Sequence, residues 1–202
     1  MDAVERLQKM TTINELTCER IACKVMQLAY IISNSMCTEF KKNAKAILSQ
    51  PVKCAAIMTD IQGNDDTVSY DVMLNTVLKR TSHNCDISPI IKGIIRDMEK
   101  RFKGGNLADW EVVEEALSEF IDSCARLAWG LVVQTPPLTL EFNDKPVYNP
   151  NQHQLSGIKS ESIKPDTVLV YIWPVLREQD NGRVVCKGIL TKNGEIGKIK
   201  KT

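Results

Sequence analysis

Histidine is scarce in this sequence of 202 residues, which contains only His83 and His153. A hydrolase with a cysteine or serine nucleophile would have to use one of these two as its general base. The sequence also lacks a phosphate-binding glycine loop, a Gly-x-Gly-x-x-Gly motif, a His-Glu-x-x-His motif and a calcium-loop pattern. We therefore expect no catalytic residues, no metal site and no cofactor.

Neither sign of charge dominates, since 26 basic residues face 25 acidic residues and the net charge is +1. No global field attracts nucleic acid or an anionic membrane, so binding of either would have to be local. The three tryptophans are too few for a base-stacking platform, and we expect no nucleic-acid partner. No apolar run approaches the roughly 20 residues that span a bilayer.

The sequence also has no Cys-x-x-Cys pair, although it contains seven cysteines. An odd number of scattered cysteines favours reduced thiols in a cytosolic type of compartment over a disulfide framework or a zinc site. The N-terminus has no apolar segment of the kind found in a signal peptide. The chain is otherwise ordinary globular material, long enough for one sizeable core or for two halves that share an interface.

Apolar residues recur at spacings of three and four in the first two thirds of the sequence, and this period predicts amphipathic helices. Thr12 and Glu15 fit a capping box, in which each side chain accepts a hydrogen bond from the other's backbone N–H. The helix that starts there should run to about Ser49, because Pro51 disfavours helical geometry in the residue ahead of it. Its predicted apolar stripe consists of Ile21, Val25, Leu28, Ile32, Met36 and Phe40.

Ser88-Pro89 predicts another helix start, with serine at the cap and proline at the first helical position. Asn106 is the expected cap of the next helix, which places Trp110 and Leu127 inward. The opposite face of that helix is acidic, and we interpret it as solvated, with a docking surface for a basic partner as the alternative. The predicted helices cover residues 12–49, 52–61, 67–80, 88–103 and 106–133.

Pro136-Pro137 marks a hinge between a helical part, residues 1–135, and a β-rich part, residues 136–202. Short β-branched runs beyond it predict strands at 138–142, 167–173, 183–190 and 196–199, with a turn at Asp180-Asn181-Gly182. Residues 149–164 should form a long surface loop. The sequence thus predicts an α+β fold, a single composite domain over 1–202, in which an antiparallel bundle of four to five helices packs against a small antiparallel β-sheet.

Residues 168–176, Val-Leu-Val-Tyr-Ile-Trp-Pro-Val-Leu, form an apolar run rich in β-branched and aromatic side chains, which predicts a buried strand. Pro174 should end this strand where it leaves the sheet. We expect it to be the central strand of the β-rich part, with Trp173 packed toward Trp129 at the end of the last helix. Trp173→Ala should then cost about 3–5 kcal/mol of stability.

An ordered series of motifs follows Cys124: a helix that ends near Trp129, the step Val133-Gln134-Thr135-Pro136-Pro137, a loop with Tyr148 and His153, the run at 170–176, and Lys187-Gly188. Over about residues 124–191 this series resembles the C-terminal domain of the mitochondria-eating protein family. The helical pattern upstream is compatible with that domain and no coiled coil precedes it, so we expect the isolated C-terminal domain or a divergent relative. The fingerprint residues of the resemblance are Trp129, Pro136, Pro137, His153, Trp173, Pro174, Lys187 and Gly188.

The resemblance implies a non-enzymatic binding and assembly module of mitochondrial quality control, which self-associates and binds the anionic mitochondrial lipid cardiolipin. It also implies a cytoplasmic protein that is recruited to mitochondria, at the outer membrane or in the interior. Cardiolipin binding requires clustered basic residues beside an apolar surface. Two clusters are candidates, although each is also compatible with a plain solvated surface: Lys41, Lys42 and Lys45 on the long helix, and Lys198, Lys200 and Lys201 near the end of the sequence.

Two hypotheses of other classes stay open. The first is a protein scaffold that recognises a partner peptide at a sheet edge, without lipid binding, and that has an apolar groove near the loop of His153. The second is a cysteine hydrolase that uses Cys124 and His153. In the structural interpretation of His153, its ring forms local hydrogen bonds that hold the long loop in place.

Overall fold

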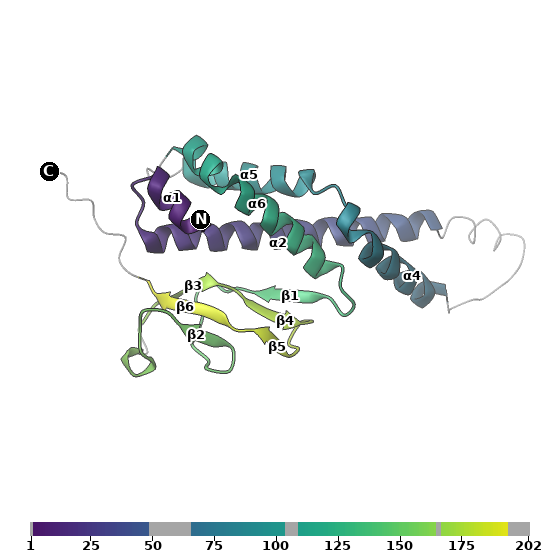
Figure 1. Cartoon of the computed structure of the whole chain (residues 1–202). Helices are drawn as coiled ribbons and strands as arrows, with labels where there is room; N and C mark the ends of the chain where they lie inside the picture. The colour runs from purple at the N-terminus through teal and green to yellow at the C-terminus, as the bar shows by residue number, and fades with distance from the viewer. Residues whose placement is uncertain (1, 49–65, 104–108, 165–166, 194–202) are drawn as a thin grey trace, which may run out of the picture.

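The computed structural model describes residues 2–48, 66–103, 109–164 and 167–193. Within these ranges, five α-helices all precede residue 133 and six strands all follow residue 137. The helices lie on one side of the molecule and the strands on the other (Figure 1). The predicted α+β fold, a helical bundle packed against a small β-rich part, is therefore confirmed.

The long helix α2, Glu15–Leu48, runs through the centre of the helical part and contacts α1, α5 and α6. The residue at which it was predicted to end, Ser49, lies outside the described residues. The other helices are α1 Ala3–Met10, α4 Asp66–Thr81, α5 Ser88–Lys103 and α6 Trp110–Val132. The helix predicted at 52–61 and the strand predicted at 196–199 lie outside the described residues.

The cap of α2 differs from the prediction. The side-chain Oδ1 of Asn14 accepts a hydrogen bond from the backbone N–H of Thr17 at 2.9 Å, so Asn14 is the cap and the predicted capping box at Thr12 is wrong. Both residues are of a type that caps helices. Burial of Ile13 between α1 and α2 fixes the path of the chain and thereby selects Asn14.

At the starts of α5 and α6, the carboxylate of a nearby aspartate accepts a hydrogen bond from a backbone N–H group. Asp109, rather than Asn106, caps α6 by accepting a hydrogen bond from the N–H of Glu111 at 3.2 Å. At α5 the N–H of Ser88 donates to the carboxylate of Asp86 at 2.9 Å, so Ser88 is the first helical residue rather than the cap. Hydrogen bonds from the Ser88 hydroxyl and from the Ser88 backbone N–H lower the pKa of the Asp86 carboxyl.

The helical core is formed by apolar side chains of all five helices, among them Leu7, Val25, Ile94 and Leu117. Two residues predicted to point inward are instead exposed: Phe40 is 47% exposed and Leu127 is 49% exposed. Periodicity correctly identifies an apolar stripe, but it does not show how far a neighbouring element extends to cover that stripe.

The strands form two three-stranded sheets rather than one. The first sheet has the order β1-β4-β5, with β1 Leu138–Glu141, β4 Val175–Glu178 and β5 Val184–Cys186. The second has the order β2-β6-β3, with β2 His153–Leu155, β3 Leu169–Trp173 and β6 Gly188–Lys192. Pairing is antiparallel except between β2 and β6, which are parallel.

The strand predictions are confirmed at β1 and β3. The strand predicted at 183–190 is divided at Lys187 into β5 and β6, which belong to different sheets. The predicted turn at Asp180-Asn181-Gly182 joins β4 to β5, and a Cβ at Gly182 would lie 1.5 Å from the carbonyl oxygen of Glu178. The predicted loop at 149–164 contains β2, which is only three residues long.

The apolar run at 168–176 crosses from the second sheet to the first. β3 ends at Trp173, before Pro174 as predicted, and the buried Pro174 leads directly into β4 of the other sheet. The prediction of a central strand is wrong, because β6 is central and β3 is at the edge. β3 is buried all the same, since Leu169 and Tyr171 pack with Cys23 of α2.

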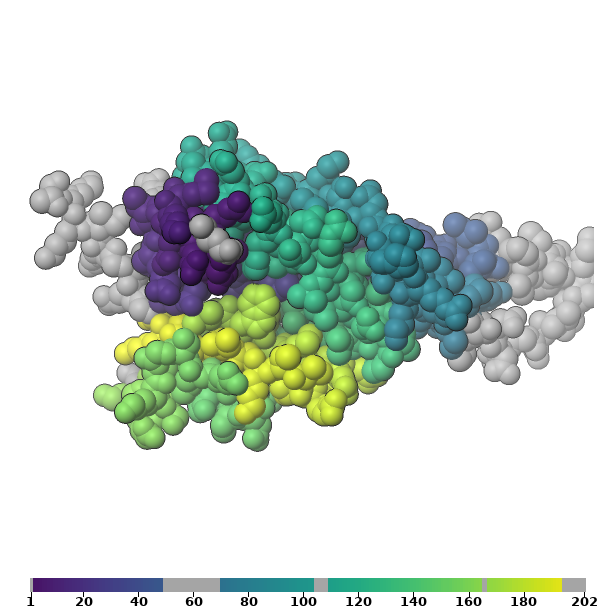
Figure 2. Space-filling view, viewed as in Figure 1, coloured from purple at the N-terminus to yellow at the C-terminus, as the bar shows by residue number. Residues whose placement is uncertain are grey.

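The β-rich part packs closely along the helices (Figure 2). Leu138, Leu140, Trp173 and Leu176 pack against the helical core, which contains Trp129. Trp173 is only partly buried, so we expect Trp173→Ala to cost less than the about 3–5 kcal/mol of a fully buried tryptophan. That the chain is a single composite domain, divided at residue 136 into a helical and a β-rich part, stays a prediction.

Candidate functional site: a basic cleft between the helices and the strands

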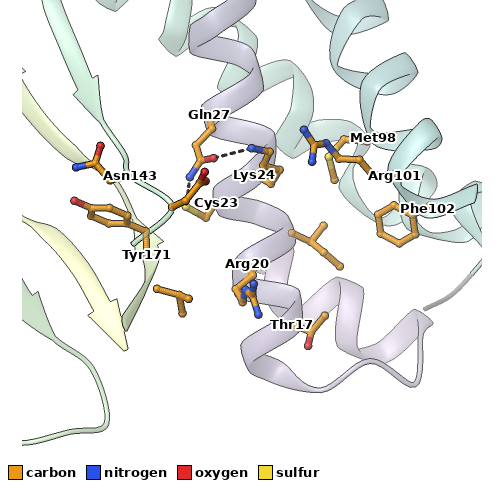
Figure 3. A pocket seen from close by; sticks show the side chains of 13 residues that line it. Thr17, Arg20, Cys23, Lys24, Gln27, Met98, Arg101, Phe102, Asn143 and Tyr171 are labelled. Carbon is orange, nitrogen blue, oxygen red and sulfur yellow. Dashed lines mark hydrogen bonds between the residues drawn. The ribbon is translucent and has the colours of Figure 1, made fainter. Parts of the chain in front are cut away.

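A cleft of about 400 Å³ lies between α2, α5 and the β-rich part. The side chains of α2 lie in its middle, with those of α5 on one side and Tyr171 and Asn143 on the other (Figure 3). Among its lining residues are three cationic side chains and a single carboxylate, so its lining carries a charge of 3 − 1 = +2. The cations are Arg20, Lys24 and Arg101, and the carboxylate is Asp144.

Two helices supply the three cations that line the cleft. Arg20 and Lys24 are four residues apart on α2 and therefore lie on the same face of that helix. Arg101 comes from the last turn of α5, where basic side chains interact favourably with the helix dipole. The side-chain ends of Lys24 and Arg101 approach each other across the cleft (Figure 3).

The polar contacts of these cations involve neutral partners. The Lys24 ammonium donates to Oε1 of Gln27 at 3.1 Å, and the amide of Gln27 donates to the Cys23 sulfur at 3.4 Å. The Arg20 guanidinium donates to Oδ1 of Asn193 at 3.3 Å. Within the described ranges, none of the three cations forms an ion pair.

Burial and like charge both act on Lys24. Burial is the main cause that lowers the pKa of its ammonium, the Arg101 charge lowers it further, and Asp144 opposes the shift. Burial also raises the pKa of the Cys23 thiol to about 11, so this thiol is neutral near pH 7. The cleft is thus a partly desolvated, positively charged site that is suited to an anion.

His153 lies on the other side of Tyr171, in the β-rich part. Its Nδ1 accepts a hydrogen bond from the backbone N–H of Asn149 at 3.1 Å, so its Nε2 carries the proton and donates to the Tyr171 hydroxyl at 3.0 Å. Burial lowers the pKa of the imidazole, Arg177 lowers it further, and Glu141 opposes the shift. The ring therefore holds the loop before β2 in place, as the structural interpretation predicted.

The hydrolase hypothesis gains no support from this geometry. Both ring nitrogens of His153 are engaged, with Asn149 and Tyr171. Cys124 is buried on α6, and burial raises the pKa of its thiol to about 12. A thiol that is protonated at neutral pH is a poor nucleophile.

The other fingerprint residues of the β-rich part surround the same loop. Gly188 pairs with His153 between the parallel strands, and its N–H donates to the carbonyl oxygen of Gln152 at 2.9 Å. A Cβ at Gly188 would lie 2.8 Å from Cγ2 of Val175, so only glycine fits without rearrangement. The ammonium of Lys187 donates to the carbonyl oxygen of Pro150 at 2.6 Å.

The remaining fingerprint residues lie where the helical and β-rich parts join. Trp129 is buried near the end of α6, and the Thr135-Pro136 peptide bond is cis. The carbonyl oxygen of Pro137 accepts a hydrogen bond from the N–H of Gln179 at 3.0 Å. None of the eight fingerprint residues lines the basic cleft.

The predicted lysine cluster on α2 is only partly available to a ligand. Lys45 forms an ion pair with Asp71 of α4 at 2.5 Å, whereas Lys41 and Lys42 form no ion pair with a described residue. Lys198, Lys200 and Lys201 lie outside the described residues.

Sequence reasoning did not identify the cleft. The spacing of Arg20 and Lys24 is a local signal, but Arg101 joins them only through the packing of α5 on α2.

In the part of the chain that the structure describes, no helix has the length and apolar character needed to cross a membrane. The same residues contain no group of three or more side chains suited to hold a metal ion.

A family model described as Mitochondria-eating protein matches residues 1–192. The match includes the helical part and so extends well upstream of the motifs at 124–191. No curated protein matches the chain, and neither does any solved structure.

Proposed function

Since the chain belongs to the mitochondria-eating protein family, a family of mitochondrial quality control, we propose that it is a non-enzymatic module that binds the anionic lipid cardiolipin and self-associates. Membership implies an association with mitochondria, and this family is not a known enzyme family. Recruitment from the cytoplasm to the outer membrane or to the interior is part of the proposal.

The observation that supports lipid binding is the surface of α2 near its C-terminal end. Lys41 and Lys42 have no ion-pair partner among the described residues, and two apolar side chains near them are exposed. Phe40 is 47% exposed and Ile47 is 66% exposed. A helix that presents apolar and cationic side chains together is the arrangement that binds an anionic membrane surface.

The ion pair of Lys45 narrows the proposed contact to Lys41 and Lys42. Each basic residue near an anionic surface contributes about 1 kcal/mol, so two lysines alone supply about 2 kcal/mol. Insertion of Phe40 and Ile47 must add the remainder. The proposal therefore requires both the charges and the apolar side chains of this segment.

Vesicle flotation tests the lipid proposal. We expect binding to phosphatidylcholine vesicles only when cardiolipin is present, with affinity reduced about thirtyfold by Lys41→Gln with Lys42→Gln. Phe40→Gln with Ile47→Gln should reduce it as well. Lys92→Gln with Lys100→Gln, which removes two exposed charges from α5, serves as the matched control. Binding that ignores cardiolipin, or equal losses in the control, would contradict the proposal.

Exposed apolar residues on α4 support self-association. Val72 is 61% exposed, Val77 is 48% exposed and Met73 is 44% exposed, which is unusual for three large apolar side chains within six residues. Sedimentation velocity should show an oligomer that dissociates when Val72 and Val77 are replaced by glutamate. A monomer at every concentration would contradict self-association.

Peptide recognition at a sheet edge is the alternative function. The edge strand β5 offers exposed Val185, which is 43% exposed, but β5 has only three residues. Such a short edge provides few backbone hydrogen bonds for an added strand. Capture of a partner that is lost on Val185→Pro, with no binding to cardiolipin vesicles, would favour this alternative.

A further inference from the structure

We infer that the cleft between α2, α5 and β3 binds a phosphate group through Arg20, Lys24 and Arg101, as part of a phosphate ester that is either a lipid headgroup or a free molecule. This inference does not rest on the proposed function, which concerns the other end of α2. It assigns a ligand class to the cleft of Figure 3.

The first argument is the unbalanced charge of the cleft. Lys24 and Arg101 approach each other, although like charges repel, and neither has an ion-pair partner among the described residues. Asp144 also lines the cleft and compensates only one of the three positive charges. An anion placed between the cations would relieve this repulsion, so the charge arrangement favours anion binding.

The second argument is the number of free hydrogen-bond donors. Lys24 uses one of its three donors on Gln27, and Arg20 uses one of its five on Asn193. Arg101 forms no hydrogen bond with a described side chain or backbone group. A guanidinium and an ammonium on facing helices can donate to different oxygens of one phosphate, and arginine does so in a bidentate manner.

The rest of the lining favours an ester over inorganic phosphate. Val170 of β3 lines the cleft and is only partly buried, so it offers an apolar surface that a carbon chain or ring attached to the phosphate can contact. Asp144 and Asn143 can accept hydrogen bonds from hydroxyl groups. We therefore expect the ligand to carry hydroxyl groups and an apolar part as well as the phosphate.

Isothermal titration with glycerol 3-phosphate and with inorganic phosphate, at constant ionic strength, tests the inference. We expect saturable binding of glycerol 3-phosphate that is stronger than that of inorganic phosphate. Lys24→Gln and Arg101→Gln should each weaken it about tenfold or more, and Arg101→Lys should weaken it less because the charge remains. Lys100→Gln removes a neighbouring charge that does not line the cleft and should change affinity less than about twofold.

Vesicle flotation with the same variants separates the two sources of phosphate. If Lys24→Gln and Arg101→Gln also reduce binding to cardiolipin-containing vesicles, the ligand is a lipid headgroup. If vesicle binding is unchanged while titration with glycerol 3-phosphate is weakened, the ligand is a free phosphate ester.

Two results would overturn the inference. One is the absence of saturable binding of either phosphate compound together with no effect of the cleft variants on vesicle binding. The other is an equal loss in Lys100→Gln, which would show non-specific attraction. Circular dichroism confirms the folding of each variant. Lys41→Gln with Lys42→Gln should titrate with glycerol 3-phosphate like the parent protein, so failure of the lipid proposal is distinguishable from failure of this one.

Discussion

The helical core and the smaller core of the β-rich part are built differently. The helical core combines apolar side chains from five helices, whereas the smaller core consists of Leu169, Tyr171, Val175 and Leu190 with Cys23 of α2. The smaller core also depends on the hydrogen bond between His153 and Tyr171 and on the close approach of Gly188 to Val175. The helices are thus held together by many apolar contacts that can substitute for one another, whereas the strands depend on a few contacts of fixed geometry.

Truncation in the helical core should give the largest effect. Leu117 of α6 is fully buried, so Leu117→Ala should lower the free energy of unfolding by about 2–5 kcal/mol. Urea denaturation followed by circular dichroism measures this loss. A loss below about 1 kcal/mol would show that the helical core is less tightly packed than the β core.

A methyl group at Gly188 tests the close contacts of the β core. Gly188→Ala should cost about 1–3 kcal/mol, because its Cβ would lie 3.0 Å from the backbone nitrogen of Val175, which cannot easily move. Gly130→Ala is the matched control, since nothing lies within 4 Å of a Cβ there. In a helix that substitution should stabilise by about 0.5–1 kcal/mol. Equal effects at both glycines would contradict the comparison.

The titration of His153 should make the β core sensitive to acid. Its pKa is lowered in the folded state, so between the unfolded value of about 6.5 and the lower folded value the unfolded chain binds more protons. The stability that neutral His153 provides is therefore fully present above about pH 6.5 and is lost as the pH falls. Urea midpoints from pH 7.5 to 5 measure this loss, which we expect to be smaller than the cost of Gly188→Ala.

His153→Gln should remove this part of the pH dependence. His83→Gln, at an exposed position in the turn after α4, should leave it unchanged. A parent protein whose stability does not change between pH 7.5 and 5 would contradict the lowered pKa of His153.

The ion pair between Lys45 and Asp71 should have the smallest effect. Both side chains are partly exposed, at 39% and 46%, so Lys45→Ala should change stability by less than about 1 kcal/mol. Thermal denaturation at low and high salt measures it. A larger loss would mean that α4 depends on this pair to stay on α2, and the helical part would then also rely on a specific contact.

Much of the helical part is predictable because its signal is local. The period of its apolar residues predicts α2, and Ser88-Pro89 marks the start of α5 to within one residue. The cap of α2 is not predictable in the same way, since Thr12 and Asn14 are both suitable and only the burial of Ile13 selects between them.

The β-rich part is less predictable because its pairing is long-range. β2 has three residues and no apolar period, and it exists because β6 pairs with it in parallel. The short strand β4 directly follows Pro174 and resembles a continuation of β3 in sequence, yet it belongs to the other sheet. Backbone hydrogen bonds between distant segments decide both.

The α+β class, the long central helix and the family resemblance can all be read from the sequence, because helical period, proline positions and ordered motifs are properties of neighbouring residues. It also pointed to Lys41, Lys42 and Lys45, whose charges are adjacent along one helix. Only the tertiary structure decided that Lys45 is neutralised by Asp71 and that Arg101 joins Arg20 and Lys24. The physical reason is that a charge acts through distance in space, and the packing of helices and strands sets that distance.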